Sequence, residues 1–272
     1  MNFDTTSPWG TWKVQGSAAL ILALIDKMPV STLSRKLALL LRKPVKASTQ
    51  EVFDRDIWGL RMRLGTRGNL TEQRWLTMPS FHDTHERDAL RAAFRPGAVF
   101  LDIGANAGFY TFWALSLRLP NLRVIAVEPA EVMLSRMRHN LAENRLTDKV
   151  DLYACAVTPQ QCEVVIHEHA GNAGQSSVRT EGSGRRVPGR PLLDILLESG
   201  VSSVDAMKID IEGFEVPVME AFYNTAPRRL WPRCVIAEIV GKDGESLKNL
   251  LVSRNYKIAH CTKMNGILVL SD

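Results

Sequence analysis

Two short acidic segments, each following a run of apolar residues, give this chain its clearest potential for chemistry. In the first, Asp102 lies near the end of the apolar run 99–103, and Gly104 and Gly108 follow it. Glycine lets the backbone turn with positive φ or approach a ligand closely. A helix that begins after these glycines offers free N–H groups and a partial positive charge to a carboxylate or phosphate. The segment therefore predicts a binding loop for a small molecule.

A second carboxylate, Glu128, follows the next predicted strand, 122–127. A carboxylate at that place can accept hydrogen bonds from both hydroxyls of a ribose. The spacing G-x-x-x-G lacks the third glycine of the dinucleotide fingerprint and the Gly-Lys-Ser/Thr of a P-loop. An acidic strand before such a loop instead resembles S-adenosylmethionine (SAM) methyltransferases. The alternative interpretation is structural, with Asp102 capping the loop and Glu128 capping the following helix.

The second acidic segment, Asp210 with Glu212, follows the predicted strand 204–209. Ligands of doubly wound sheets bind beyond the carboxyl ends of the strands, so this segment should lie beside the first glycine loop. Two neighbouring carboxylates can accept a proton from a hydroxyl, hold a divalent metal or orient a substrate. The alternative is that Glu212 and Glu215 only stabilise the first turn of the next helix, where acidic residues are favoured.

Together these segments resemble the FkbM-type SAM-dependent methyltransferases. The resemblance rests on Asp-Ile-Gly-Ala-Asn-Ala-Gly at 102–108, Glu-Pro at 128–129 and Lys-Ile-Asp-Ile-Glu-Gly-Phe-Glu at 208–215. Ser-Ser at 176–177 and Leu-Asp at 193–194 are similar to further signatures of that family. The similar region runs from about residue 80 to about residue 270 and leaves the first 50 residues outside it.

The resemblance implies SAM as the cofactor and a hydroxyl group of a small molecule, sugar or other natural product as the methyl acceptor. From their position beyond the strand end, Asp210 and Glu212 are the candidate catalytic residues, with Asp210 as the base or the orienting carboxylate. A divalent metal is compatible with these carboxylates but is not predicted. The residues that it assigns to SAM lie in the glycine loop, at the end of the second strand and at the adenine edge: Asp102, Gly104, Ala105, Asn106, Gly108, Tyr110, Glu128, Pro129 and Ala156.

Three further residues are candidate substrate contacts. Glu238 ends the apolar run 234–239, where an acidic side chain is costly unless it is paired or functional. His167 and His169 are two residues apart and would share one face of a strand. Such a pair could bind a metal ion, but no third ligand matches them, so an exposed strand face is the plainer interpretation. One of them could still act as a general base over the substrate.

The elements that must position these residues alternate from residue 98 onward between apolar strands and amphipathic helices. This alternation predicts a mostly parallel sheet covered on both faces. Only four residues join the last two predicted strands, 256–261 and 266–270, so the last strand should run antiparallel. The expected fold class is α/β: a doubly wound, Rossmann-like, seven-stranded methyltransferase sheet with an antiparallel last strand.

The N-terminal part is expected to be a separate helical and hairpin extension, residues 1–80, before a methyltransferase domain at 81–272. Residues 60–65 alternate apolar and polar, as a half-buried strand does, and residues 65–69 supply the turn of a small hairpin. A helix is expected over 84–94, and His82, His85 and Glu86 either line the cofactor pocket from it or lie on its surface.

The composition is ordinary for a globular protein, with 45% hydrophobic and 23% charged residues in 272. No apolar run approaches the roughly 18–20 residues of a membrane-spanning helix, and no signal peptide is indicated. The four cysteines show no C-x-x-C pairing and are expected to be reduced. We therefore expect a cytoplasmic protein without a transmembrane segment, and the sequence leaves a homo-oligomer open.

The positive charge is concentrated before residue 100. Residues 1–99 carry 15 Lys and Arg against nine Asp and Glu, whereas residues 100–272 carry 19 against 20. A basic half of this kind attracts an anionic substrate, a nucleic acid or a membrane surface. The plainer interpretation is a solvated basic face without a partner.

Two other functions stay open beside the transfer of a methyl group to a small molecule. A nucleic-acid methyltransferase is favoured only by the basic half, and basic residues without interleaved stacking aromatics are weak support, so no nucleic-acid partner is expected. A non-catalytic SAM-fold interaction module is disfavoured by the intact glycine loop. A dinucleotide oxidoreductase is a distant third. The nucleic-acid alternative rests on Trp58, Arg61, Arg63, Arg67 and Arg74.

Overall fold

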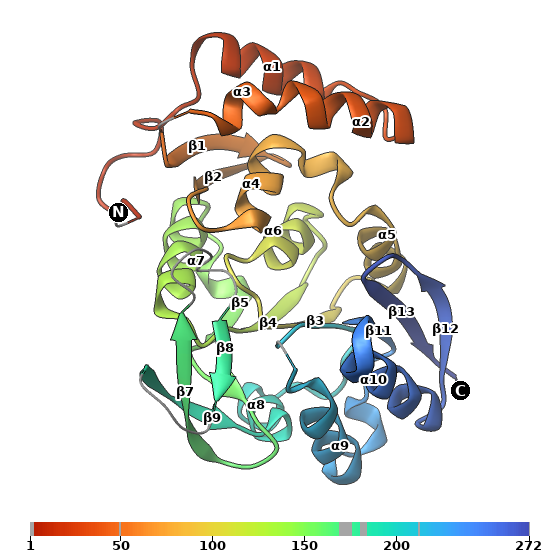
Figure 1. Cartoon of the computed structure of the whole chain (residues 1–272). Helices are drawn as coiled ribbons and strands as arrows, with labels where there is room; N and C mark the ends of the chain where they lie inside the picture. Colours follow the sequence, from red (N-terminus) through yellow and green to blue (C-terminus); the bar gives the residue numbers. More distant parts are fainter. Residues whose placement is uncertain (1–2, 49, 169–175, 180–183, 212, 272) are drawn as a thin grey trace.

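A twisted seven-stranded sheet forms the centre of the structure, a computed structural model that describes residues 3–48, 50–168, 176–179, 184–211 and 213–271 (Figure 1). Five of its strands run parallel. The order across the sheet is β12 (Tyr256–Cys261), β13 (Asn265–Leu270), β11 (Cys234–Glu238), β10 (Ala206–Ile209), β3 (Val99–Ile103), β4 (Arg123–Val127) and β5 (Val150–Tyr153).

The last strand, β13, is antiparallel to both of its neighbours, β11 and β12. The short connection from β12 to β13 leaves room only for a hairpin, because a parallel crossover needs a dozen or more residues. This confirms the predicted fold class, a doubly wound Rossmann-like sheet of seven strands with an antiparallel last strand.

Helices cover both faces of the sheet because each strand presents apolar side chains to both sides. Phe100 of β3 belongs to one buried cluster and its neighbour Leu101 to the other. Strands buried on both faces are typical of parallel sheets. The helices after residue 82 are α5 (Thr84–Ala93), α6 (Phe109–Ser116), α7 (Glu131–Glu143), α8 (Leu192–Ser199), α9 (Glu215–Thr225) and α10 (Gly241–Ser253), with short 3-10 turns η2 (Thr147–Lys149) and η3 (Arg228–Leu230).

The N-terminal part packs as a layer of helices over a two-stranded hairpin (Figure 1). The predicted helix over 84–94 is confirmed as α5. The one-turn helix α3 follows α2 directly, and Pro44 is its second residue. The N-terminal elements are α1 (Gly16–Asp26), α2 (Thr32–Leu41), α3 (Lys43–Lys46), β1 (Val52–Ile57), β2 (Leu60–Gly65), α4 (Leu70–Thr77) and η1 (Pro79–Phe81).

The hairpin turns at Trp58 and Gly59, so the turn predicted at 65–69 was wrong. Both residues have positive φ, 54° and 76°, as the two-residue turn of a twisted hairpin requires. The Trp58 ring stacks on Trp75 at 6.0 Å and meets Phe109 edge-on at 5.4 Å. These tertiary contacts hold a bulky residue in a conformation that it rarely adopts.

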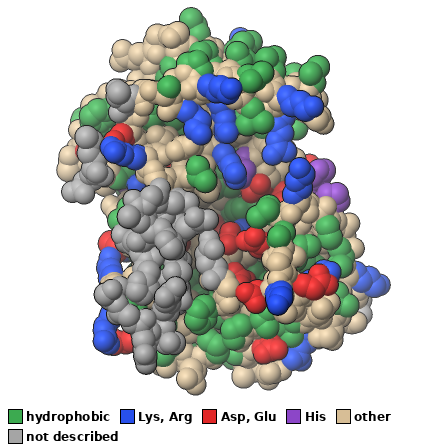
Figure 2. Space-filling model, in the orientation of Figure 1, with side chains coloured by type: hydrophobic (Ala, Val, Ile, Leu, Met, Phe, Trp, Pro, Cys, Tyr) green, Lys and Arg blue, Asp and Glu red, His purple; other side chains and the backbone are tan. Residues whose placement is uncertain are grey.

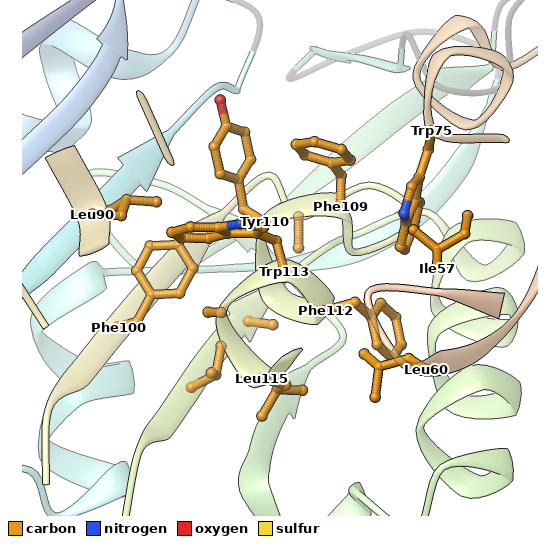
Figure 3. Packing of buried hydrophobic residues seen from close by; sticks show 14 of the residues in the cluster. Ile57, Leu60, Trp75, Leu90, Phe100, Phe109, Tyr110, Phe112, Trp113 and Leu115 are labelled. Atoms are coloured by element: carbon orange, nitrogen blue, oxygen red, sulfur yellow. The ribbon is translucent and has the colours of Figure 1, made fainter. Parts of the chain in front are cut away.

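The hairpin and α4 share one core with the central sheet. Met62 and Trp75 are buried in the same cluster as Phe100, Phe109 and Phe112 (Figure 3). The ring of Trp75 lies 5.7 Å from that of Phe109 and 5.8 Å from that of Phe112. These ring contacts hold α4 against α6, the helix that follows the glycine loop. The domain boundary at residue 80 stays a prediction.

A buried ion pair ties the start of the chain to the hairpin. Arg63 donates to Asp54 through Nε at 2.7 Å and through Nη2 at 2.9 Å. The same guanidinium donates to the carbonyl oxygens of Asp4, Ser7 and Pro8. Arg63 is therefore part of the interior. Arg63 is thus lost from the surface on which the nucleic-acid alternative rested, and Trp58 is half-buried.

A second, four-stranded sheet was not predicted as such. β5 ends at Tyr153, and the two-residue strand that follows it belongs to this second sheet. Its order is β6 (Ala156–Val157), β9 (Arg185–Arg190), β7 (Cys162–Glu168) and β8 (Ser176–Arg179). Within the described ranges, no helix combines the length and apolarity that a bilayer crossing requires.

Candidate functional site

A cavity of about 240 Å³ opens at the carboxyl ends of β3, β4, β10 and β11. Strand ends at the point where the chain order reverses are the usual binding crevice of doubly wound sheets. Figure 2 shows a hollow here, with Asp and Glu side chains along its lower edge. Most of the predicted site residues line the cavity: Asp102, Gly104, Ala105, Asn106, Tyr110, Glu128, Pro129, Ala156, Asp210 and Glu238.

The glycine loop is shaped by close backbone contacts. Gly104 has a φ of 73°, and its N–H donates to the carbonyl oxygen of Val127 at 2.9 Å. A Cβ on Gly104 would lie only 1.9 Å from the carbonyl oxygen of Asp210. Gly108 has a φ of 89° and caps the start of α6 without lining the cavity. Both glycines are therefore needed for the backbone path, and only the first borders the cavity.

Glu128 holds the glycine loop through its backbone. Its carboxylate accepts from the N–H of Asn106 and from the N–H of Ala130, each at 2.8 Å. Burial, together with the nearby charges of Asp102 and Asp210, raises the pKa of Glu128 to about 7, although the two N–H donors oppose this rise. The N-cap residue of α7 is Ala130, so Glu128 is not the helix cap of the structural alternative and instead joins the glycine loop to the residue that begins α7. Each of its oxygens keeps the capacity to accept a second hydrogen bond.

Asp102 is buried and is held by α6. Its Oδ2 accepts from the backbone N–H of Thr111 at 3.0 Å and from the hydroxyl of Thr111 at 2.6 Å. Burial raises the pKa of Asp102, and the Thr111 bonds and the Lys208 charge oppose that rise. The structural role considered for Asp102 is therefore present in a residue that also lines the cavity.

An ion pair between Lys208 and Asp210 occupies the acidic side of the cavity. The Lys208 Nζ lies 2.7 Å from the Asp210 Oδ2. The Lys208 charge lowers the pKa of Asp210. Although burial disfavours the ammonium group, the carboxylates of Asp210 and Asp102 raise the pKa of Lys208. Asp210 is therefore a stable anion at neutral pH and a weak proton acceptor.

Glu238 faces the same cavity from the end of β11, as predicted from its position. It is half-buried. Burial raises its pKa, and the negative charges of Asp210 and Glu215 add to the effect. The pKa values of Asp210 and Glu238 are thus shifted in opposite directions. Lys208 keeps Asp210 ionised, whereas Glu238 binds a proton more readily.

Sequence reasoning missed two other groups at the cavity. Lys208 was noted only as part of a motif, although a lysine inside the apolar run 204–209 is the same signal that pointed to Glu238. Asp83 accepts from the hydroxyl of Tyr110 at 2.8 Å. Its neighbour His82, which lines the cavity, has a pKa lowered to about 4, chiefly by burial. His82 is therefore neutral at physiological pH.

Three predicted residues are not placed. Glu212 and His169 lie outside the described residues, and for His167 only the backbone, paired with Ser177 in the second sheet, is described. Glu86 is buried and accepts from the Asn265 side chain, so it braces α5 against the β12–β13 turn. In the part of the chain that the structure describes, no group of three or more His, Cys, Asp or Glu side chains is arranged to hold a metal ion.

Comparison with known proteins identifies the class to which this fold and site belong. Residues 102–256 match the family model of the methyltransferase FkbM domain. The match spans more than half of the chain, and the chain belongs to the FkbM methyltransferase family. The protein is a methyltransferase of the SAM-dependent type, as the glycine loop and Glu128 indicated.

Two curated relatives were found. The 31-O-demethyl-FK506 methyltransferase FkbM of Streptomyces tacrolimicus is 27% identical over 184 residues, which cover 55% of this chain and 68% of that protein. The AMB antimetabolite synthetase AmbE of Pseudomonas aeruginosa is 24% identical over 238 residues. That match covers 70% of this chain and 11% of AmbE, so the chain is similar to a small part of a much longer protein.

Solved methyltransferase structures are similar at low sequence identity. A methyltransferase FkbM from Methylobacillus flagellatus KT is 16% identical, with a TM-score of 0.45, and the match covers 73% of this chain and 53% of that chain. An O-methyltransferase from Bacillus cereus, in complex with SAH, is 12% identical with a TM-score of 0.47. That match covers 96% of this chain and 99% of the Bacillus chain.

Proposed function

We propose that this protein transfers the methyl group of SAM to a hydroxyl group of a small-molecule, sugar or natural-product acceptor. One observation carries the proposal: Glu128 and the glycine loop border the same cavity as the Lys208–Asp210 pair and Glu238. The first two suit a nucleoside-containing cofactor, and the others suit a hydroxyl group whose proton must be removed.

The residues of the glycine loop fit SAM in type and position. Gly104 lines the cavity, and the absence of a Cβ lets its backbone lie against the carbonyl group of Asp210. We assign the ribose hydroxyls to Glu128 and the adenine edge to Ala156, which lines the cavity from β6. Asp102, Ala105, Asn106 and Tyr110 are assigned to the methionine and loop side, with Pro129 beside the ribose.

Asp210 and Glu238, on the other side of the cavity, have different roles toward the acceptor. When bound, SAM supplies a methyl group on a positively charged sulfur. Asp210, kept ionised by Lys208, accepts a hydrogen bond from the acceptor hydroxyl and orients its oxygen. As the oxygen attacks the methyl carbon, its O–H turns from Asp210 to Glu238, whose raised pKa makes it the better proton acceptor. The new C–O bond forms as the S–C bond breaks, and the hydroxyl proton passes to Glu238. Holding the reacting atoms aligned contributes up to about 7–11 kcal/mol in favourable cases.

The name of one relative supports oxygen as the acceptor atom. The Streptomyces tacrolimicus protein is a 31-O-demethyl-FK506 methyltransferase, and this chain matches 68% of its length. The paired carboxylates of this chain are consistent with that chemistry, because a hydroxyl group loses a proton on methylation. Glu212 remains a candidate catalytic residue beside Asp210, because it belongs to the same motif.

Methyl transfer from labelled SAM to a panel of hydroxylated sugars and natural products tests the proposal. We expect label in an ether bond. Glu238→Gln should lower kcat about 100-fold or more, as loss of a general base does, and should leave binding of S-adenosylhomocysteine unchanged. Glu220→Gln, an exposed change of the same kind on α9, is the control. Label on nitrogen or carbon, or full activity of Glu238→Gln, contradicts the assigned chemistry.

Binding without turnover is a separate result of the same experiment. Titration calorimetry with S-adenosylhomocysteine and NADH shows whether the adenosyl ligand alone binds. Saturable binding of S-adenosylhomocysteine with no transfer to any acceptor of the panel would favour the non-catalytic interaction module. Binding of NADH alone would overturn the cofactor assignment.

A further inference from the structure

A second, larger cavity of about 760 Å³ adjoins the first and is built by different segments. We call it the basic groove. Its walls come from α2, from the end of α4 and η1, from the start of α5 and from the turn between β12 and β13. The two cavities share five lining residues, so a bound molecule can extend from one into the other: Arg74, His82, Asp83, Met264 and Asn265.

The basic groove carries four cationic side chains: Arg35, Arg42, Arg74 and Lys263. None of the four has an ion pair with a described residue. Figure 2 shows Lys and Arg side chains gathered on the upper edge of the hollow, opposite the acidic edge.

The positive charges in the groove lie close enough to act on one another. Desolvation and the charge of Arg74 lower the pKa of Arg42. Burial lowers the pKa of His82, and the charges of Arg74, Arg87 and Arg35 add to this effect against the opposing charge of Asp83. Cations gathered without neutralising partners destabilise the free protein and favour an anionic ligand.

The two acidic residues of the groove are already engaged. Asp83 accepts from Tyr110 and lies 3.2 Å from the His82 Nδ1. Glu86 accepts from the hydroxyl of Thr262 and from the amide of Asn265. Neither is paired with the four cations. The groove also has apolar walls: Leu39, Met78, Phe81 and Met264.

We propose that the methyl acceptor carries a phosphate group, which the basic groove binds through Arg35, Arg42, Arg74 and Lys263 while the acceptor hydroxyl lies at Asp210 and Glu238. This inference rests on the proposed function and adds the substrate class. Arginine guanidinium groups bind phosphate oxygens through two parallel N–H donors and remain charged at all relevant pH values. The apolar walls are suited to a hydrocarbon part of the same molecule.

Titration calorimetry on the full chain saturated with S-adenosylhomocysteine tests the inference. The probes are octyl phosphate, glucose 1-phosphate and the neutral octyl β-glucoside, each below its micellar concentration. Binding of octyl phosphate alone supports a lipid-like phosphate, and binding of glucose 1-phosphate with equal or higher affinity supports a soluble sugar phosphate. The inference is overturned if neither phosphate binds, or if octyl β-glucoside binds as tightly as octyl phosphate.

Charge variants locate the binding. The combined variant Arg42→Gln and Arg74→Gln should weaken the tighter phosphate probe about tenfold or more, since hydrogen bonds to charged groups have that strength. Lys replacements at both positions should restore part of the affinity. Lys36→Gln combined with Lys43→Gln removes two charges from exposed positions of α2 and α3 outside the groove and is the matched control. Equal losses in the double variant and the control would place the phosphate elsewhere.

Different results would contradict the phosphate-binding inference and the proposed function. If a phosphorylated acceptor is methylated with unchanged kcat/KM by the Arg42→Gln and Arg74→Gln variant, the groove has no role in acceptor binding and the proposed function stands. If S-adenosylhomocysteine does not bind the wild-type chain, the proposed function itself fails. A thermal unfolding midpoint close to that of wild type shows that the double variant is folded.

Discussion

The backbone of Gly104 touches the carbonyl oxygen of Asp210, so that a Cβ on the glycine would come within 1.9 Å of that oxygen. The Asp210 N–H in turn donates to the carbonyl oxygen of Ile103 at 3.0 Å. The loops after β3 and β10 therefore fix each other. One carries the groups that we assign to the cofactor and the other carries the groups that we assign to the acceptor, so neither can shift alone.

Gly104→Ala should separate the two loops. Because the obstacle is backbone, we expect the change to lower the free energy of unfolding by about 3 kcal/mol or more, at the upper end of overpacking effects. Binding of S-adenosylhomocysteine should be lost in parallel. Gly97→Ala is the control, since Gly97 also has positive φ but nothing lies within 4 Å of its Cβ position. It should cost only about 1–2 kcal/mol. Equal effects in urea denaturation would refute the steric argument.

Lys208→Met should change the pH dependence of methyl transfer. Lys208 is the main cause of the lowered pKa of Asp210, so its removal should raise the pKa of that carboxyl. The acidic limb of kcat/KM should therefore move to higher pH, because Asp210 must be ionised to orient the hydroxyl. Lys257→Met, on the exposed side of β12, should leave the profile unchanged. An unmoved acidic limb would remove Asp210 from the proposed mechanism.

Glu128→Gln should change how stability depends on pH. The pKa of Glu128 is raised from 4.5 to about 7, so between these values the folded protein holds a proton that the unfolded chain has released. The free energy of unfolding therefore falls as pH rises from 4.5 to about 7 and levels off above it. The pKa difference corresponds to about 3 kcal/mol, which the glutamine variant should lose from this slope.

Urea denaturation without adenosyl ligands between pH 4.5 and 8 measures this slope. Part of it should remain in the variant, because burial also raises the pKa of Glu72 to about 7. The Glu220→Gln control should keep the full wild-type slope. A slope that is the same in wild type and Glu128→Gln would mean that Glu128 is ionised throughout this range.

Arg61 and Arg63 are a matched pair on β2, two residues apart. Arg63 is fully buried, whereas the Arg61 side chain is 59% exposed and pairs with Glu143 at 3.3 Å. We expect Arg63→Met to lower the free energy of unfolding by about 3–5 kcal/mol, because it leaves Asp54 buried and unpaired. Arg61→Met should cost less than about 1 kcal/mol. Similar midpoints for the two variants in urea would contradict the structural role of Arg63.

The parts of the site that could be predicted are those encoded locally. The apolar run 99–103 and the two glycines that follow it predict a buried strand and a tight loop, and Glu128 follows the next strand. An acidic residue in the apolar run 234–239 pointed to the cavity for the same reason. In each case the side-chain type conflicts with its apolar surroundings or the backbone demands glycine, and both signals are visible without tertiary structure.

The remaining features depend on contacts between distant segments. Alternation along β2 predicts an exposed Arg63, but Asp54 and three N-terminal carbonyl groups make its burial favourable. A tryptophan gives no sequence signal for a turn, and the positive φ of Trp58 is stabilised by tertiary contacts that include the rings of Trp75 and Phe109. The basic groove likewise exists only when α2 is packed beside the turn between β12 and β13.

That arrangement has a consequence for the order in which the site is assembled. Arg35 and Lys263, which line the basic groove, belong to opposite ends of the sequence, whereas the glycine loop and Glu128 lie within one β-α-β unit. Closing a long loop costs more chain entropy than closing a short one, and contacts between distant segments slow folding. We therefore expect the cofactor half to form early and the groove last. In a partly unfolded chain, the groove would be the first part to open.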